Sequence, residues 1–482
     1  MHNFTLVLRS RAAFVLIPAA LTFLFILSIP EMASSTEAAG AGVASGETTG
    51  VILSVGEMPG AGNATGETAD AGTSTPFITV RDGQFIKNGE PWYFVGTNFW
   101  YGMHLGADNE YADRDRLLRE LDMLADLGLN NLRVLASSEG PDDGGWRVLP
   151  SLMPEPGVYN EDILVGLDFL LAEMGKRDQY GVLVLNNFFQ WSGGMAQYVS
   201  WVTGEPIPYP HDESNTWTDY QTFSARFYTL PAARRIYKDF LEMLLARVNT
   251  ITGVAYIDDP VIKSWQLANE PRVFGFEEEY ADWVRSASSF IKERAPRQLV
   301  SLGGEGKLPY EDAGTQFEEL GAEASLDYLT IHLWIENWQR YDPYRPKETF
   351  HAASGFAMGY VANHIAISER LNKPLVLEEF GVSRDTRNYH PSAPVTYRDT
   401  FFTMIFEMLL HLRMRESTFA GLNLWSWSGE GYPEFPMEYW ELGKPLTGDP
   451  PHEEQGWYGI YEHDTSTHDL IRRYNESLGN LE

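Results

Sequence analysis

The stretch Asp115–Leu135 reads DRLLRELDMLADLGLNNLRVL and joins a predicted helix to a predicted strand. Its leucines recur at helical spacing as far as Leu127, and Gly128 can end the helix. The run Asn131–Leu135 that follows is short and largely apolar, which is typical of a buried strand. A helix followed directly by a buried strand is half of a parallel βαβ unit.

The same alternation of strand and helix patterns continues from Phe77 to the end of the chain. Eight strands are predicted, at Tyr93–Asn98, Asn131–Leu135, Val182–Asn187, Ile262–Asn269, Leu299–Leu302, Tyr328–Leu333, Leu375–Glu379 and Leu422–Trp427. The predicted helices are Asp115–Leu127, Glu161–Gln179, Ala232–Arg247, Glu277–Arg294, Phe356–Leu371, Tyr397–Met414 and Thr467–Leu478. Eight parallel strands with intervening helices close most naturally into an α/β (β/α)₈ TIM barrel, and an open doubly wound sheet is the alternative.

The first 76 residues differ in composition from the rest of the chain. Arg9 and Arg11 precede an apolar run from Ala12 to Ile29, so residues 1–30 predict a signal peptide or, if uncleaved, a membrane anchor. Residues 31–76 consist mainly of Gly, Ala, Ser and Thr and predict a flexible, disordered linker. We therefore expect a secreted or cell-surface protein whose catalytic domain spans residues 77–482.

Composition narrows the possible partners and chemistry. A net charge of −31 argues against nucleic acid as a partner, because phosphate binding depends on Lys and Arg. The absence of cysteine excludes disulfides and thiolate catalysis. The chain also has no His-Glu-x-x-His, Gly-x-Ser-x-Gly or Walker A string. We expect a monomer that needs no cofactor and no metal, although the acidic pair Asp142–Asp143 leaves a structural calcium open.

Two of the predicted strands end in glutamate. Ser264–Arg272 reads SWQLANEPR, and Pro374–Gly381 reads PLVLEEFG. Side chains at the carboxyl ends of barrel strands line the active site, so Glu270 and Glu379 can meet across the mouth of the barrel. Two carboxyl groups about 5–5.5 Å apart are what hydrolysis of a glycosidic bond with retention requires.

Around these glutamates, Asn269-Glu270-Pro271 and Glu379-Phe380-Gly381 resemble the paired signatures of family-five glycoside hydrolases of clan A. The likeness spans roughly residues 77–477 and is strongest to bacterial endo-β-1,4-mannanases. It implies that Glu270 is the general acid/base and Glu379 the nucleophile. The implied activity is retaining, endo-acting hydrolysis of β-1,4-mannosidic bonds in mannan, glucomannan or galactomannan. Because neighbouring strand residues alternate between faces, Glu378 is expected to pair outside the barrel.

The resemblance also implies a set of substrate-binding residues. Arg133 would hold the nucleophile ionised, Asn269 would bind the sugar 2-hydroxyl, and Trp425 would lie beneath the −1 sugar. The other candidates at strand ends are Trp100, Asn187, Trp191, His332, Trp334 and Trp338. At Trp334 the chain departs from the family, which commonly has a tyrosine two positions after the histidine.

Two other functions stay open at this stage. A β-1,4-glucanase (cellulase) of the same family would share every motif above, and the preference for β-mannan as the substrate partner rests on the resemblance alone. A non-catalytic barrel that binds polysaccharide belongs to a different class of protein. Sugar release from mannan separates this binding protein from an enzyme.

Overall fold

The computed structural model describes residues 75–309 and 315–479. The predicted export segment at 1–30 lies outside the described residues, as does almost all of the predicted linker at 31–76. Within the described ranges, no helix combines the length and apolarity needed to cross a membrane.

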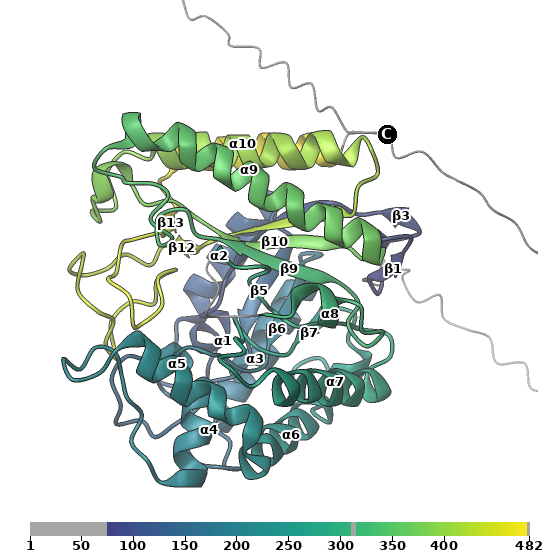
Figure 1. The fold of residues 1–482 in the computed structure, drawn as a ribbon, viewed down its shortest axis with the longest axis vertical. Helices are drawn as coiled ribbons and strands as arrows, with labels where there is room; N and C mark the ends of the chain where they lie inside the picture. The colour runs from purple at the N-terminus through teal and green to yellow at the C-terminus, as the bar shows by residue number, and fades with distance from the viewer. Residues whose placement is uncertain (1–74, 310–314, 480–482) are drawn as a thin grey trace, which may run out of the picture. The chain divides into compact units, whose positions relative to one another are not determined.

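Eight parallel strands form the centre of the fold (Figure 1). They are β4 (Phe94–Asn98), β5 (Asn131–Leu135), β6 (Tyr180–Val184), β7 (Ile262–Gln266), β8 (Leu299–Ser301), β9 (Leu329–Leu333), β10 (Leu375–Phe380) and β11 (Phe419–Leu424). Their order, β8-β7-β6-β5-β4-β11-β10-β9, runs around a nearly closed barrel. Backbone bonds complete the seam between β8 and β9, because the amide of Asp327 donates to Val300 (2.8 Å) and that of His332 to Glu305 (3.1 Å). The predicted TIM barrel is confirmed.

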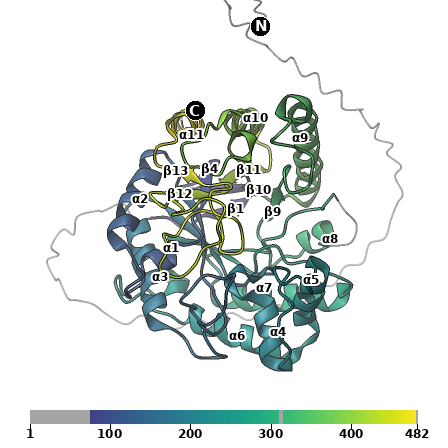
Figure 2. The same cartoon turned by 90° about the vertical axis from the view of Figure 1, so that its left-hand side faces the viewer.

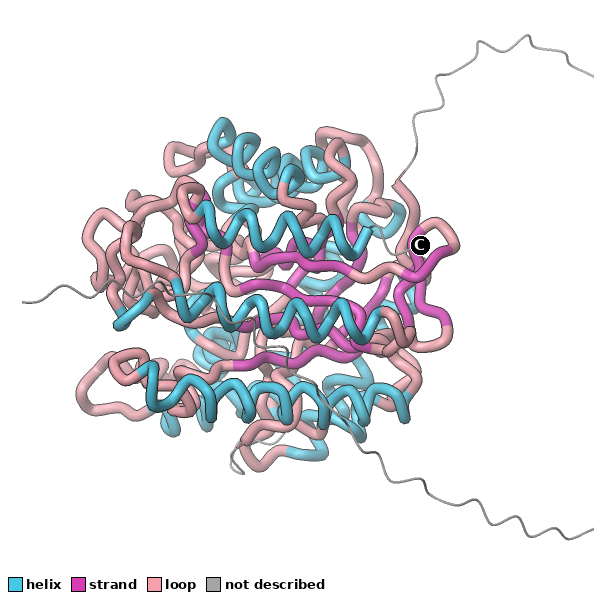
Figure 3. Tube along the Cα trace, turned by 90° about the horizontal axis from the view of Figure 1, so that it is seen from above, coloured by secondary structure: helices cyan, strands magenta, loops and turns pink. Residues whose placement is uncertain are grey.

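Helices surround the strands on the outside (Figures 2 and 3). They are α1 (Gly102–Leu105), α2 (Arg114–Asp126), α3 (Glu161–Gly175), α4 (Gly194–Thr203), α5 (Trp217–Ala225), α6 (Pro231–Leu245), α7 (Glu277–Arg294), α8 (Phe317–Gly321), α9 (Pro346–Leu371), α10 (Thr396–Arg413) and α11 (Thr465–Gly479). The seven predicted helices are all present. Among the described residues only the short helix α8 lies between β8 and β9, where no helix was predicted.

The α2–β5 unit shows why the local sequence folds as it does. The side chain of Asp113 accepts a hydrogen bond from the amide of Arg116 (2.9 Å) and caps the start of α2. Leu117, Leu121 and Leu124 are buried on the inner face of the helix. Gly128, with φ +74°, turns the chain out of the helix and into β5.

Three short strands that the sequence did not predict precede the barrel. They are β1 (Thr79–Arg81), β2 (Gln84–Lys87) and β3 (Glu90–Pro91), and they form a small antiparallel sheet. Phe85 of β2 is fully buried and packs edge-on against Tyr328, just before β9, with ring centroids 5.2 Å apart. The small sheet therefore covers the amino-terminal end of the barrel and leaves the carboxyl ends of the strands free for a site.

Two long loops were also missed, and both lie at the carboxyl ends of the strands. The segment between β6 and α6 contains α4 and α5, and the segment after β11 contains β12 (Trp427–Gly429) and β13 (Ile460–Tyr461). Neither loop has the simple strand–helix periodicity of the barrel. These two loops determine the shape of the site.

Candidate active site

A cavity of about 530 Å³ opens at the carboxyl ends of the strands. It lies where barrel enzymes place their chemistry. The predicted site residues that line it are Trp191, Asn269, Glu270, Trp334, Trp338, Glu379 and Trp425. Glu270 and Glu379 are separated by 109 positions in the sequence, and the barrel brings them together in this one cavity.

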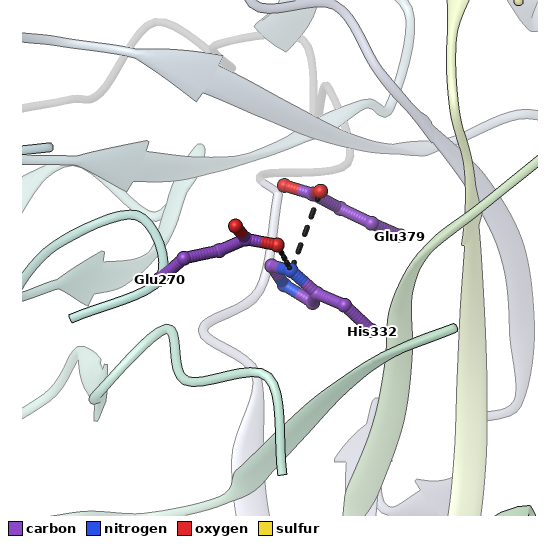
Figure 4. Close-up of side chains that lie close together, drawn as sticks. All are labelled: Glu270, His332 and Glu379. Atoms are coloured by element: carbon purple, nitrogen blue, oxygen red, sulfur yellow. Dashed lines mark hydrogen bonds and ion pairs between the residues drawn. The ribbon is translucent and has the colours of Figure 1, made fainter. Parts of the chain in front are cut away.

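The carboxylates of the two glutamates lie close together, and both approach the same ring nitrogen of His332 (Figure 4). One oxygen of each carboxylate and one nitrogen of His332 all lie within 4.8 Å of one another. His332 Nδ1 is 2.6 Å from Glu270 Oε1 and 3.3 Å from Glu379 Oε2. This separation fits the short spacing of a retaining pair and is well below the roughly 6.5–9.5 Å that an inverting pair needs.

Arg133, in the middle of β5, contacts the predicted nucleophile directly. Its Nη1 donates a hydrogen bond to Glu379 Oε1, and its Nη2 donates to Asn269 Oδ1 (2.8 Å). The guanidinium is almost fully buried, so its charge is poorly screened by solvent. It therefore favours the ionised form of Glu379 and fixes Asn269 in place.

The backbone of Glu270 has a left-handed conformation, with φ +50°. Such a conformation is costly for a residue other than glycine and is often found at functional sites. Here the amide of Glu270 donates to the carbonyl of Gly303 (2.9 Å), and the amide of Asn269 donates to Asn186 (2.9 Å). These bonds tie the Asn-Glu turn to the neighbouring strand ends.

Glu378 corrects one prediction. It was expected outside the barrel, but its side chain is only 1 % exposed and lies inside, where Gln266 Nε2 donates to its Oε2 (2.8 Å). The alternation rule fails because the pairing of β10 with β9 shifts between Leu377 and Glu379, so that Glu379 rather than Glu378 pairs with His332. This β-bulge directs two consecutive carboxylates inward.

Burial and the neighbouring His332 shift the pKa values of the two glutamates in opposite directions. Burial alone would raise the pKa of Glu270, but the hydrogen bond and charge of His332 outweigh it and lower that pKa. For Glu379, burial outweighs His332 and Arg133 and raises the pKa to about 7. Although burial opposes it, the surrounding carboxylates raise the pKa of His332 to about 10. Together these shifts favour a cationic imidazole beside the two glutamates.

Two predicted substrate contacts lie behind the cavity wall. Trp100 is 3 % exposed, and its indole nitrogen donates to the carbonyl of Gly448 (2.9 Å), so the loop after β11 covers it. Asn187 is fully buried, and its Oδ1 accepts from Asn269 Nδ2 (3.2 Å). Neither side chain lines the cavity, so direct contact with sugar stays a prediction for both residues. Asn187 orients Asn269.

Trp334 stands at the position where the resemblance implies a tyrosine. Its indole nitrogen points toward Glu270 Oε1 at 3.4 Å, which is a long hydrogen bond. Its ring packs edge-on against Trp425, with centroids 5.7 Å apart. Trp334 therefore contacts the predicted acid/base and braces the tryptophan predicted to support the −1 sugar.

Comparison with known proteins agrees with this geometry. The family model described as GH family 5 beta-mannosidase-like matches residues 75–482. The chain belongs to this family. The family 5 mannosidase from Rhizomucor miehei is 41% identical with a TM-score of 0.78, over 84% of this chain and 98% of that one. Mannan endo-1,4-beta-mannosidase 3 from Solanum lycopersicum is 31% identical over 75% of this chain and 86% of its own length.

This family 5 glycoside hydrolase also has cavity residues that the sequence motifs did not reveal. Trp217 and Gln221 come from the long loop after β6, and His452 and Glu453 come from the loop after β11. They are distant in sequence from the strand ends, so no strand pattern marks them. Arg272, by contrast, ends the Ser264–Arg272 stretch, and its bidentate ion pair with Glu305 (2.6 and 2.8 Å) also lines the cavity.

The two long loops contact each other at His211 and His452. His211 Nε2 donates to the carbonyl of His452 (3.0 Å), and Trp146 stacks on His211 with ring centroids 4.0 Å apart. Tyr439 packs edge-on against Trp146 at 4.7 Å. We call these four residues the loop bridge. No described residue from the loops directly after β4 and β5 lines the cavity, whereas His452 of the bridge does.

Among residues 75–309 and 315–479, one group of acidic and histidine side chains is compact enough to be considered for a metal ion, and it is Glu270, His332 and Glu379. Arg133 and the cationic His332 already supply positive charge to both carboxylates. We therefore assign this cluster to acid–base chemistry.

Proposed function

We propose that the enzyme hydrolyses β-1,4-mannosidic bonds of mannan, glucomannan or galactomannan with retention of configuration. The observation that carries the proposal is the position of one oxygen from each of Glu270 and Glu379 within 4.8 Å of one another, both close to His332 Nδ1. Support for the substrate comes from relatives whose names describe mannan endo-1,4-beta-mannosidases, including that of tomato. The likeness to bacterial mannanases in particular stays a prediction.

In the first step, an oxygen of Glu379 attacks the anomeric carbon and the glycosidic C–O bond breaks. Glu270 gives its proton to the leaving oxygen, and His332 Nδ1, at 2.6 Å, can supply that proton to Glu270. In the second step, Glu270 takes a proton from water. The water oxygen attacks the anomeric carbon and releases Glu379 from the ester.

The acidic side of the kcat/KM profile is expected near neutral pH. Glu379 must be ionised to attack, and burial raises its pKa to about 7, so the active fraction falls as pH drops through this value. Because Glu270 and Glu379 interact closely, the acidic limb of the kcat/KM profile reports the titration of the two glutamates together. Initial rates at low substrate from about pH 4 to about pH 9 measure it. A flat kcat/KM from about pH 5 to about pH 7 would contradict this expectation.

We propose internal cleavage as the mode of action. A second candidate, removal of mannose from a chain end, is favoured by one specific observation, the loop bridge. His452 of this bridge lines the cavity and is held by His211, so a long polysaccharide that binds on both sides of the glutamates has to pass these residues.

Products from mannohexaose decide between these modes. Internal cleavage predicts that oligosaccharides of intermediate length form first, while mannose stays a minor product. Early formation of mannose and mannopentaose in equal amounts would contradict internal cleavage and support action at chain ends. Rates on galactomannan, glucomannan and carboxymethylcellulose test the sugar preference, and activity on cellulose alone would support the β-1,4-glucanase instead.

We further propose that the enzyme is exported, secreted or held at the cell surface, and that it works as a monomer. The support is the basic and apolar pattern of residues 1–30 and the linker composition of residues 31–76. The mass of the mature protein tests cleavage of the segment, and sedimentation tests the monomer. An intact amino terminus in a membrane fraction would indicate an uncleaved anchor.

A further inference from the structure

Glu378 is a buried carboxylate on β10 for which the proposed mechanism has no use. The bulge in β10 places it inside the barrel, directly next to Glu379 in the sequence. Keeping a carboxylate in such a place costs free energy unless nearby groups compensate its charge. The groups that compensate it are those that contact the catalytic pair.

On one side, Glu378 acts on Arg133 through Gln266. Glu378 Oε2 accepts a hydrogen bond from Gln266 Nε2 (2.8 Å), which directs the other end of the amide toward the arginine. Gln266 Oε1 then accepts from Arg133 Nε (2.8 Å). Arg133 is thereby held with its two terminal nitrogens on Glu379 and Asn269. Glu378 Oε2 is also 3.5 Å from Arg133 Nε itself.

On the other side, Glu378 faces the imidazole. Its Oε2 is 3.9 Å from His332 Nε2, while His332 Nδ1 contacts Glu270 and Glu379. Both ring nitrogens therefore point toward carboxylates. A neutral ring carries only one N–H, whereas the cation carries two and can donate toward both sides.

Two more titratable groups are close enough to act on Glu378. They are Lys263 on β7 and Tyr328 just before β9. Lys263 donates to Asn131 Oδ1 (2.8 Å) and lies over the ring of Phe85 at 4.4 Å, toward the amino-terminal end of the barrel. The charged groups facing Glu378 from β5, β7, β9 and β10 are thus Arg133, Lys263, His332 and Glu379. Of these, Arg133 and His332 link it to the reacting residues.

We propose that Glu378 is a positioning residue of the reaction: it orients Arg133 through Gln266 and is the counter-ion that keeps His332 cationic between Glu270 and Glu379. The role rests on the proposed function, because it matters only if those two glutamates perform the chemistry. Glu378 itself does not touch the sugar.

The substitution E378Q separates charge from shape. The glutamine keeps an oxygen that accepts from Gln266, but it removes the negative charge and offers an N–H to His332 Nε2, which favours the neutral imidazole. E378D keeps the charge. D168N is the matched control. Asp168 on α3 is a fully buried carboxylate that accepts from Arg247 (2.7 Å), and it lies away from the cavity.

Two readouts test the proposal. In E378Q, the ring of His332 followed by NMR with labelled histidine should lose its proton about two pH units below the wild type. The ratio of kcat/KM on mannan between E378Q and wild type should also fall about tenfold from about pH 6 to about pH 9. E378D should follow the wild-type profile, and D168N should lower Tm without moving the profile.

The proposal is overturned if His332 titrates in E378Q as it does in the wild type, or if E378D moves the profile as far as E378Q. The NMR titration needs no activity, so it decides the role of the Glu378 charge even in an inactive variant. Failure of the proposed function looks different, because the wild-type enzyme would then release no sugar from mannan.

Discussion

Replacing Glu379 with alanine is expected to lower kcat on mannan by about 10⁴-fold or more, since no other group can form the covalent intermediate. Arg133 donates to this carboxylate, and among the described residues only Glu270 joins it and His332 in one compact acidic cluster. The variant should remain folded, because Glu378 still faces the buried charge of Arg133 at 3.5 Å when the Glu379 carboxylate is removed. Initial rates on mannan and a thermal unfolding curve measure both effects.

Chemical rescue distinguishes a lost nucleophile from a damaged site. Azide is small enough to occupy the space that the side chain leaves, and it can attack the anomeric carbon in place of Glu379. With an activated β-mannoside, E379A should therefore form the α-mannosyl azide, the product of a single displacement. Near-normal hydrolysis of mannan by E379A without azide would refute the assignment.

The second large effect is expected at Glu270. In E270A, kcat on mannan should fall about 10²–10⁴-fold, which is the usual contribution of a general acid or base. The loss should depend on the leaving group. With 2,4-dinitrophenyl β-mannoside, whose phenolate needs no proton, the first step should stay fast and the intermediate should accumulate.

Azide again supplies the control for E270A. It needs no general base, so it should accelerate breakdown of the intermediate and give the β-mannosyl azide, the opposite anomer to that from E379A. A loss of equal size on mannan and on the dinitrophenyl substrate, with no effect of azide, would show that Glu270 does not transfer the proton.

The barrel could be predicted because its elements repeat a simple pattern. Each strand is a short apolar run, and each long helix has apolar residues on one face, as in the α2–β5 unit. Glu270 and Glu379 could be predicted because strands in a parallel barrel all end on one side. Pairing between residues far apart in sequence then followed from the fold.

Other parts of the site could not be predicted, for physical reasons that differ from residue to residue. The inward position of Glu378 depends on a bulge, which changes the face of a side chain without altering the pattern of apolar residues. The burial of Trp100 depends on Gly448 in a loop more than three hundred positions away. The bridge between His211 and His452 likewise depends on two long loops that meet only in the folded protein.

The proposed mechanism depends most on two carboxylates that act from opposite sides of one anomeric carbon in two successive displacements. Following the first turnovers on mannohexaose by ¹H NMR, before mutarotation, tests this directly. Retention predicts that each newly released reducing end first appears as the β-anomer and converts to the α-anomer only afterwards. An α-anomer that forms first would mean inversion by a single displacement, and it would contradict the nucleophilic role of Glu379.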